Sequence, residues 1–252
     1  MMLQFLLLTA CNEAKPVQGK VVDLWNNPIE GATVIANGQS VETDAYGVFT
    51  VPRFEGEGTF KAGKEGFVQE EQALTLEAGD TDGPVFKLYK KPADTGFYAI
   101  TTGDYLHLQP ATVKVVGHDA DAMYGIDAPS DKMFIDGEDL KLVYKIDFSL
   151  AQVKELGLEL RRLEYVEKAE MATIGGGSKT EVPIDLYTDA GNVPLSIEKL
   201  KSKGHFLLSS KEPLKPGVYA LQSQSLLTPE NEDYWKQIPE ALRTVYPITI
   251  RE

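Results

Sequence analysis

The stretch DAYGVFTV at Asp44–Val51 combines a turn with an alternating apolar run. An aspartate at the start of a turn can accept hydrogen bonds from the backbone two residues on, and Gly47 can take a positive φ at little cost. After the glycine, the side chains of Val48–Val51 alternate in polarity, as they do in a strand with one buried face. The stretch therefore predicts a tight hairpin. The alternative role of Asp44, as an acid or metal ligand, is disfavoured by its spacing to Gly47.

Similar apolar runs flank this stretch on both sides. About seven short strands with regularly spaced turns can be placed between Val17 and Tyr89, and no helical period competes with them. Residues 16–90 are therefore expected to form an all-β sandwich or barrel.

Four separated blocks carry a resemblance to a known family. They read VQGKVVD at Val17–Asp23, NPIEGATV at Asn27–Val34, TDAYGVF at Thr43–Phe49 and KEGF at Lys64–Phe67. In content and order they resemble the carboxypeptidase regulatory-like domain. The resemblance implies a transthyretin-like, immunoglobulin-like β-sandwich that serves as a non-catalytic accessory domain.

The first eleven residues, MMLQFLLLTAC, end in the single cysteine of the chain, Cys11. Their last four residues resemble the lipobox of bacterial lipoproteins. The resemblance implies a signal peptide at residues 1–10, a diacylglyceryl group on the Cys11 thiol, and a lipidated tether at residues 11–15. Two or more acyl chains, palmitate among them, hold a protein stably at a membrane, whereas one holds it only marginally.

Two features of this segment leave alternatives open. A signal peptide normally carries Lys or Arg before its apolar run, but the first charged residue here is Glu13. A true start upstream of Met1 is therefore one alternative, and a buried strand with a free cysteine is another. Asn12 replaces the aspartate that tends to retain such lipoproteins at the inner membrane, so the resemblance favours the outer membrane of a bacterial cell envelope.

A polar junction with a proline, KKPAD at Lys90–Asp94, separates residues 16–90 from residues 94–252. The second region resembles no family and is expected to be a β-rich domain, with one domain favoured over two. A few short helices are expected in it, at Leu150–Leu156, Ile197–Ser202 and Glu230–Thr244, the last kinked or broken by Pro239.

Two tyrosines of the second region follow a glycine at the start of a predicted strand. LKPGVY at Leu214–Tyr219 resembles the turn of immunoglobulin-like sandwiches in which the phenol bonds back to the backbone. GFYAI at Gly96–Ile100 shares the Gly-x-Tyr-Ala-aliphatic pattern of Gly217–Leu221.

The chain is acidic, with a net charge of −13 and a pI near 4.8. Nucleic acid is excluded as a partner, because binding it relies on Lys and Arg displacing counterions. Solubility is the ordinary reason for such acidity, and a calcium site is the alternative. Asp119, Asp121 and Asp127 are the candidate metal ligands, although their loop lacks the glycine and the third ligand of an EF-hand.

The motifs of catalysis and zinc binding are absent from the sequence. His107, His118 and His205 lie far apart, match no zinc spacing, and are expected on the surface. No catalytic residue and no cofactor is predicted. Tyr234 and Trp235 could stack against a sugar, but burial of their helix against the sheet is favoured.

Together these features predict a non-enzymatic, lipid-anchored envelope protein that acts as a structural, adhesive or partner-binding module. Its expected partners are the membrane, through the anchor, and another envelope protein or a surface ligand. Two alternatives stay open: a calcium- or carbohydrate-binding envelope module, and an enzyme with an unfamiliar site in residues 94–252.

Overall fold

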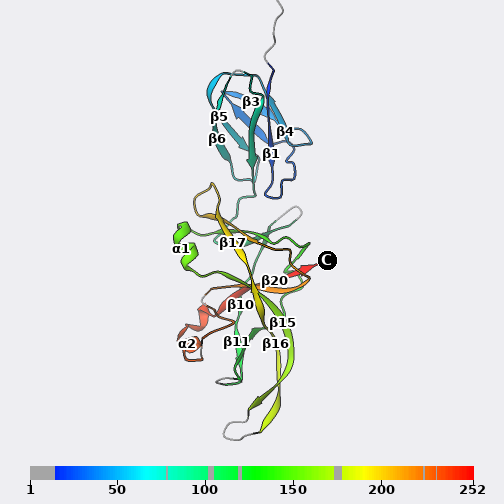
Figure 1. The fold of residues 1–252 in the computed structure, drawn as a ribbon, viewed down its shortest axis with the longest axis vertical. Helices are drawn as coiled ribbons and strands as arrows, with labels where there is room; N and C mark the ends of the chain where they lie inside the picture. Colours follow the sequence, from blue (N-terminus) through cyan, green and yellow to red (C-terminus); the bar gives the residue numbers. More distant parts are fainter. Residues whose placement is uncertain are drawn as a thin grey trace, which may run out of the picture. The chain divides into compact units, whose positions relative to one another are not determined.

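The computed structural model describes residues 15–77, 79–101, 105–118, 121–172, 178–223, 225–230 and 232–252. The chain divides into two compact units, Met1–Lys91 (unit 1) and Pro92–Glu252 (unit 2). In the described residues the regular secondary structure of both units is almost entirely strand, with two short α-helices in unit 2 (Figure 1). The chain is therefore all-β, as its alternating runs predict.

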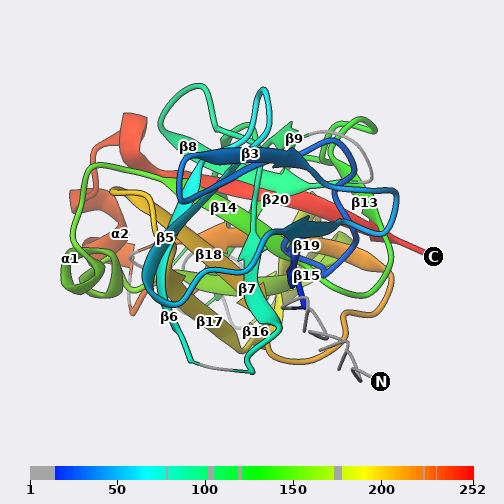
Figure 2. The same cartoon turned by 90° about the horizontal axis from the view of Figure 1, so that it is seen from above.

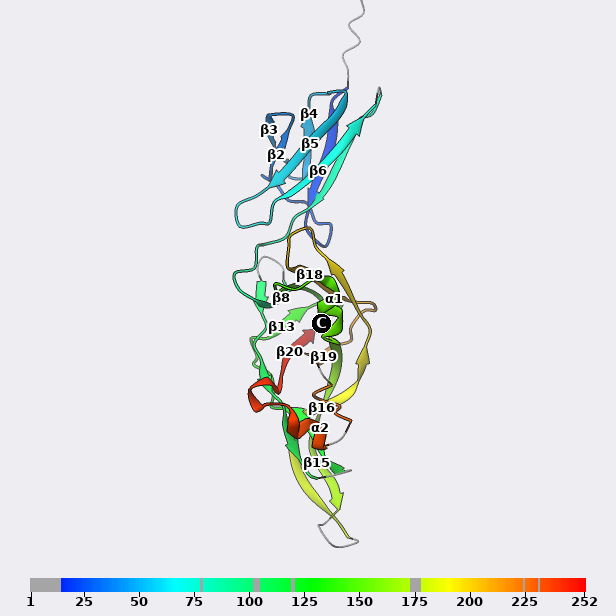
Figure 3. The ribbon, with the colours of Figure 1, turned by 90° about the vertical axis from the view of Figure 1, so that its left-hand side faces the viewer.

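Unit 1 is a sandwich of two sheets. Its described strands are β1 (Val17–Val22), β2 (Thr33–Ala36), β3 (Gln39–Glu42), β4 (Val48–Val51), β5 (Gly56–Gly63), β6 (Glu70–Leu76) and β7 (Asp82–Lys87). One sheet has the order β4-β1-β7 and the other β3-β2-β5-β6, in which β5 and β6 lie side by side (Figure 3). The buried rings of Phe49, Phe60 and Phe86 join the two sheets.

The turn at Asp44–Gly47 has the hydrogen bonds that its sequence predicts. Asp44 Oδ1 accepts from the backbone N–H groups of Tyr46 at 2.9 Å and Val48 at 2.8 Å. Gly47 has a φ of +69°, and a Cβ there would clash with the carbonyl oxygen of Val21. The expected hairpin is wrong, however, because β3 pairs with β2 and β4 pairs with β1. The turn carries the chain from one sheet to the other.

Side chains bridge the two sheets between β6 and β7. Glu70 Oε2 accepts from the backbone N–H of Lys87 at 2.8 Å. Gln72 Nε2 donates to the carbonyl oxygen of Val85 at 3.0 Å and to Glu70 Oε1 at 2.8 Å. The N–H of Lys87 and the carbonyl oxygen of Val85 on the edge strand β7 are thereby hydrogen-bonded within unit 1, so they do not remain free to pair with a strand of another chain.

Unit 2 contains a five-stranded and an eight-stranded sheet in its described residues. The smaller sheet has the order β17-β18-β14-β8-β9, and the larger has the order β10-β20-β19-β15-β16-β12-β11 with β13 beside β20. β14 and β18 lie side by side in Figure 2. The elements are β8 (Gly96–Ile100), β9 (Tyr105–His107), β10 (Ala111–Thr112), β11 (Lys114–Val116), β12 (Met123–Ile126), β13 (Phe134–Asp136), β14 (Lys141–Lys145), α1 (Leu150–Glu155), β15 (Glu159–Ala172), β16 (Lys179–Val193), β17 (Leu195–Lys199), β18 (His205–Ser210), β19 (Gly217–Gln222), α2 (Glu232–Gln237) and β20 (Thr244–Arg251).

The larger sheet of unit 2 is covered on both faces along β19. Tyr219 and Leu221 belong to the core shared with the smaller sheet. Ala220 faces the other way and packs with Leu227 and Ile238, which belong to the segment around α2. Alternate residues of one strand thus serve two cores, as the period of a strand requires.

The three predicted helices have three outcomes. Leu150–Leu156 is confirmed, since α1 begins after Ser149, whose hydroxyl accepts from the backbone N–H of Gln152 at 3.3 Å. Ile197–Ser202 is wrong, because residues 195–199 pair along their length with β18. Glu230–Thr244 is confirmed in part, as α2 and a short 3₁₀-helix at Glu240–Leu242 flank Pro239.

The two tyrosine turns have matching hydrogen bonds. Tyr219 Oη donates to the carbonyl oxygen of Lys215 at 2.8 Å, as predicted. Tyr98 Oη donates to the carbonyl oxygen of Asp94 at 3.0 Å. In both cases the phenol anchors the backbone four residues upstream, and a glycine with positive φ starts the strand. Each phenol therefore fixes how a strand enters its sheet.

Replacing Gly47 by alanine should destabilise unit 1 more than the same change at Gly66. Both glycines have positive φ, which costs an L-residue about 1 kcal/mol. Only at Gly47 does the new Cβ meet backbone, whereas open space surrounds Gly66. In urea unfolding followed by circular dichroism, we expect Gly47→Ala to lose at least about 1 kcal/mol more than Gly66→Ala. Equal losses would contradict the steric role of Gly47.

Tyr219→Phe should lower the free energy of unfolding by about 1 kcal/mol, because the carbonyl of Lys215 loses its donor. Tyr46, whose ring is 77% exposed, provides the control. Tyr46→Phe should leave the unfolding midpoint unchanged in the same urea titration. If the two variants behaved alike, the anchoring role of the Tyr219 phenol would be wrong.

Candidate functional site

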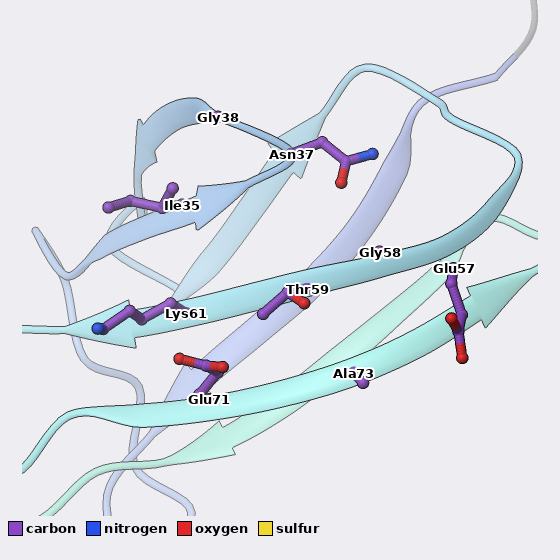
Figure 4. A pocket seen from close by; sticks show the side chains of 9 residues that line it. All are labelled: Ile35, Asn37, Gly38, Glu57, Gly58, Thr59, Lys61, Glu71 and Ala73. Carbon is purple, nitrogen blue, oxygen red and sulfur yellow. The ribbon is translucent and has the colours of Figure 1, made fainter.

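A hollow of about 540 Å³ lies on the outward face of β2, β5 and β6 in unit 1 (Figure 4). Its residues come from three strands and from the β2–β3 turn. They are Ile35, Asn37, Gly38, Glu57, Gly58, Thr59, Lys61, Glu71 and Ala73. We refer to it as the sheet hollow.

Strand register creates the sheet hollow. Ile35 stands opposite Lys61, which in turn stands opposite Glu71, so these three side chains form one row across the sheet. The next row on the same face places Thr59 opposite Ala73. Because these two side chains are short, they form the floor of the sheet hollow, and the longer side chains of Lys61, Glu71 and Glu57 stand around it. Figure 4 shows Lys61 and Glu71 toward one end and Glu57 toward the other.

The chemistry of the sheet hollow suits a protein surface. It offers the ammonium group of Lys61, the carboxylates of Glu57 and Glu71, and the side chain of Ile35, which is 43% exposed. Protein–protein contacts commonly combine apolar side chains with polar and charged ones. None of its nine lining residues carries an aromatic ring, so the hollow lacks a stacking surface for a sugar.

The predicted lipidation residue, Cys11, lies outside the described residues, as do Asn12 and the candidate metal ligand Asp119. The other two candidate ligands are engaged elsewhere. Asp121 Oδ2 accepts from the backbone N–H of Ala172 at 2.9 Å, and Asp127 forms an ion pair with Lys114 at 2.6 Å. Within the described ranges, no three His, Cys, Asp or Glu side chains are grouped to hold a metal ion.

The histidines differ in their surroundings. His107 stacks on Tyr98 with ring centroids 4.4 Å apart, and His118 is exposed. His205 is only 7% exposed, so its expected position on the surface is wrong. It lies at the start of β18, which is flanked by β17 and β14, and it stands opposite Lys145 of β14.

Trp235 packs within unit 2, as the sequence favours. The indole is 6% exposed, the guanidinium of Arg243 lies 3.9 Å from its ring centroid, and the ring of Tyr124 lies 5.5 Å away. Tyr234 is 38% exposed. Because both contacts cover Trp235, the pair does not present an open stacking platform.

No protein-family model matches the chain, and no curated protein matches it. Among the described residues, no helix is both long enough and apolar enough to pass through a membrane. The lipobox and the regulatory-like domain therefore stay predictions from the sequence.

Sequence reasoning missed the sheet hollow. Thr59 and Ala73 are ordinary strand residues, and only the pairing of β5 with β6 brings them together. A usable signal was present in the alternation along β5, where Phe60 and Ala62 face inward and Thr59 and Lys61 face outward.

Proposed function

We propose that this protein is a lipid-anchored protein of the bacterial cell envelope that binds another envelope protein and catalyses no reaction. Cys11 carries the anchor, and the outer membrane is favoured because Asn12 follows the cysteine. The sheet hollow is the observation that carries the partner-binding part of the proposal.

Two properties of the sheet hollow support a protein partner. First, it is open and lies on a regular sheet, so a flat or extended segment can reach it without unit 1 rearranging. Second, its row of Ile35, Lys61 and Glu71 presents apolar, basic and acidic groups in a fixed order. Such an order selects a partner by charge complementarity more than it adds affinity.

The lipid anchor accounts for the polar segment that follows Cys11. LTAC at residues 8–11 precedes a polar segment that begins with Asn12 and Glu13. A tether of this kind leaves the acyl chains in the membrane and the folded units in water. The acidic chain would then stay soluble at a surface rather than adhere to it.

Replacing Cys11 by serine should abolish lipid attachment, because the thiol is the acceptor of the diacylglyceryl group. We expect the wild-type protein to incorporate labelled palmitate and to enter the detergent phase on Triton X-114 partitioning, and Cys11→Ser to do neither. Asn12→Asp is the matched variant, which should keep the label but move toward the inner membrane. An unlabelled wild-type protein in the aqueous phase would refute the anchor.

A photo-crosslinker in the sheet hollow should capture the partner in the native host. Benzoylphenylalanine at position 59 should give a discrete adduct, and the same group at position 46, on the exposed Asp44–Gly47 turn, should not. Lys61→Glu should reduce the position-59 adduct severalfold, because it reverses the charge at the centre of the row. The same adducts from both positions, or none from position 59, would count against the sheet hollow as the contact surface.

A further inference from the structure

A cavity of about 240 Å³ in unit 2 is lined by residues from both of its sheets. Two cross-strand pairs contribute to it, one from each sheet. Phe97 stands opposite Tyr144 on β8 and β14, and Leu221 stands opposite Tyr246 on β19 and β20. We refer to it as the aromatic cavity.

The three rings of the aromatic cavity are held in place by one another. Phe97 stacks on Tyr144 with centroids 4.1 Å apart and planes at 12°. Tyr246, from the other sheet, meets Phe97 edge to face with centroids 4.8 Å apart. Both arrangements are favourable for aromatic pairs, so the cavity is pre-formed.

Aliphatic side chains form much of the remaining wall, together with the hydroxyl-bearing Ser223 and Thr244. Leu156 and Leu158 come from the turn between α1 and β15, and Leu242 comes from the 3₁₀-helix before β20. Leu242 is 60% exposed, which leaves a large apolar side chain at the cavity in contact with water. A bound apolar molecule would remove part of that surface from solvent.

The polar groups of the aromatic cavity carry no charge at neutral pH. Gln222 is 1% exposed, and its amide is already engaged: Nε2 donates to Glu159 Oε2 at 2.8 Å, and Oε1 accepts from the N–H of Leu227 at 2.7 Å. Burial, and to a smaller degree the neighbouring Tyr246, raises the pKa of Tyr144 to about 12. Its phenol therefore stays protonated, and nothing in the lining would compensate a charged ligand.

The volume of the aromatic cavity limits the size of the ligand. An apolar cavity of about 150 Å³ in a protein core accommodates benzene. The 240 Å³ here leaves room for a second ring.

We propose that the aromatic cavity binds a small, uncharged, largely apolar molecule of one or two rings. The binding depends neither on the lipid anchor nor on the sheet hollow, because every wall comes from unit 2.

The test is a fluorescence titration of the full chain with 1-naphthol, a neutral two-ring probe. Saturable one-to-one binding is expected, with a rise in the melting temperature of the protein. Its anionic analogue 1-naphthoate should bind at least tenfold more weakly, since it would bring an unpaired charge into an uncharged lining.

Leu242→Glu locates the binding. The side chain is exposed, so the fold should tolerate the change, whereas 1-naphthol affinity should fall at least fivefold and the rise in melting temperature should be lost. Val85→Glu is the matched control, because it places the same charge on an exposed apolar position of unit 1. The proposal is overturned by an absence of saturable 1-naphthol binding, by equal binding of 1-naphthoate, or by equal losses in Leu242→Glu and Val85→Glu.

Discussion

The register of strand pairing positions the side chains of both the sheet hollow and the aromatic cavity. Successive residues of a strand face opposite sides, so a slip of one residue in β5 would bring Lys61 into the core and Phe60 into water. The same constraint places Phe97 beside Tyr144 and Tyr246 beside Leu221. The register that packs the core therefore also sets which side chains line the sheet hollow and the aromatic cavity.

Short-range hydrogen bonds hold that register where strands begin. Asp44 fixes the turn that carries the chain between the sheets of unit 1, and Gly47 permits β4 to lie against β1. In unit 2 the phenols of Tyr98 and Tyr219 do the corresponding work upstream of β8 and β19. Each of these hydrogen bonds joins residues that are close in sequence. Each one also positions a strand that pairs with strands far away in sequence.

The difference between interactions that are local in sequence and strand pairings that are not explains which parts of the fold the sequence could predict. Alternation along single strands and the Asp44–Gly47 turn are local, and they correctly indicated an all-β chain with its turns. Ile197–Ser202 was mistaken for a helix because the pairing of residues 195–199 with β18 outweighs their weak local preference. His205 also lies in β18, and its burial depends on the folded structure rather than on its local sequence. Both candidate binding sites are assembled from several paired strands, so the alternation within one strand shows which residues face outward but not which residues meet there.

The covered indole of Trp235 has a spectroscopic consequence. The chain has two tryptophans, Trp25 in unit 1 and Trp235 in unit 2. Trp235 is shielded from water by Arg243 and Tyr124, whereas Trp25 is only partly buried. Each unit thus has one tryptophan, and the two indoles differ in their exposure to water. Replacing either indole by phenylalanine would leave a chain whose emission reports the melting of one unit alone.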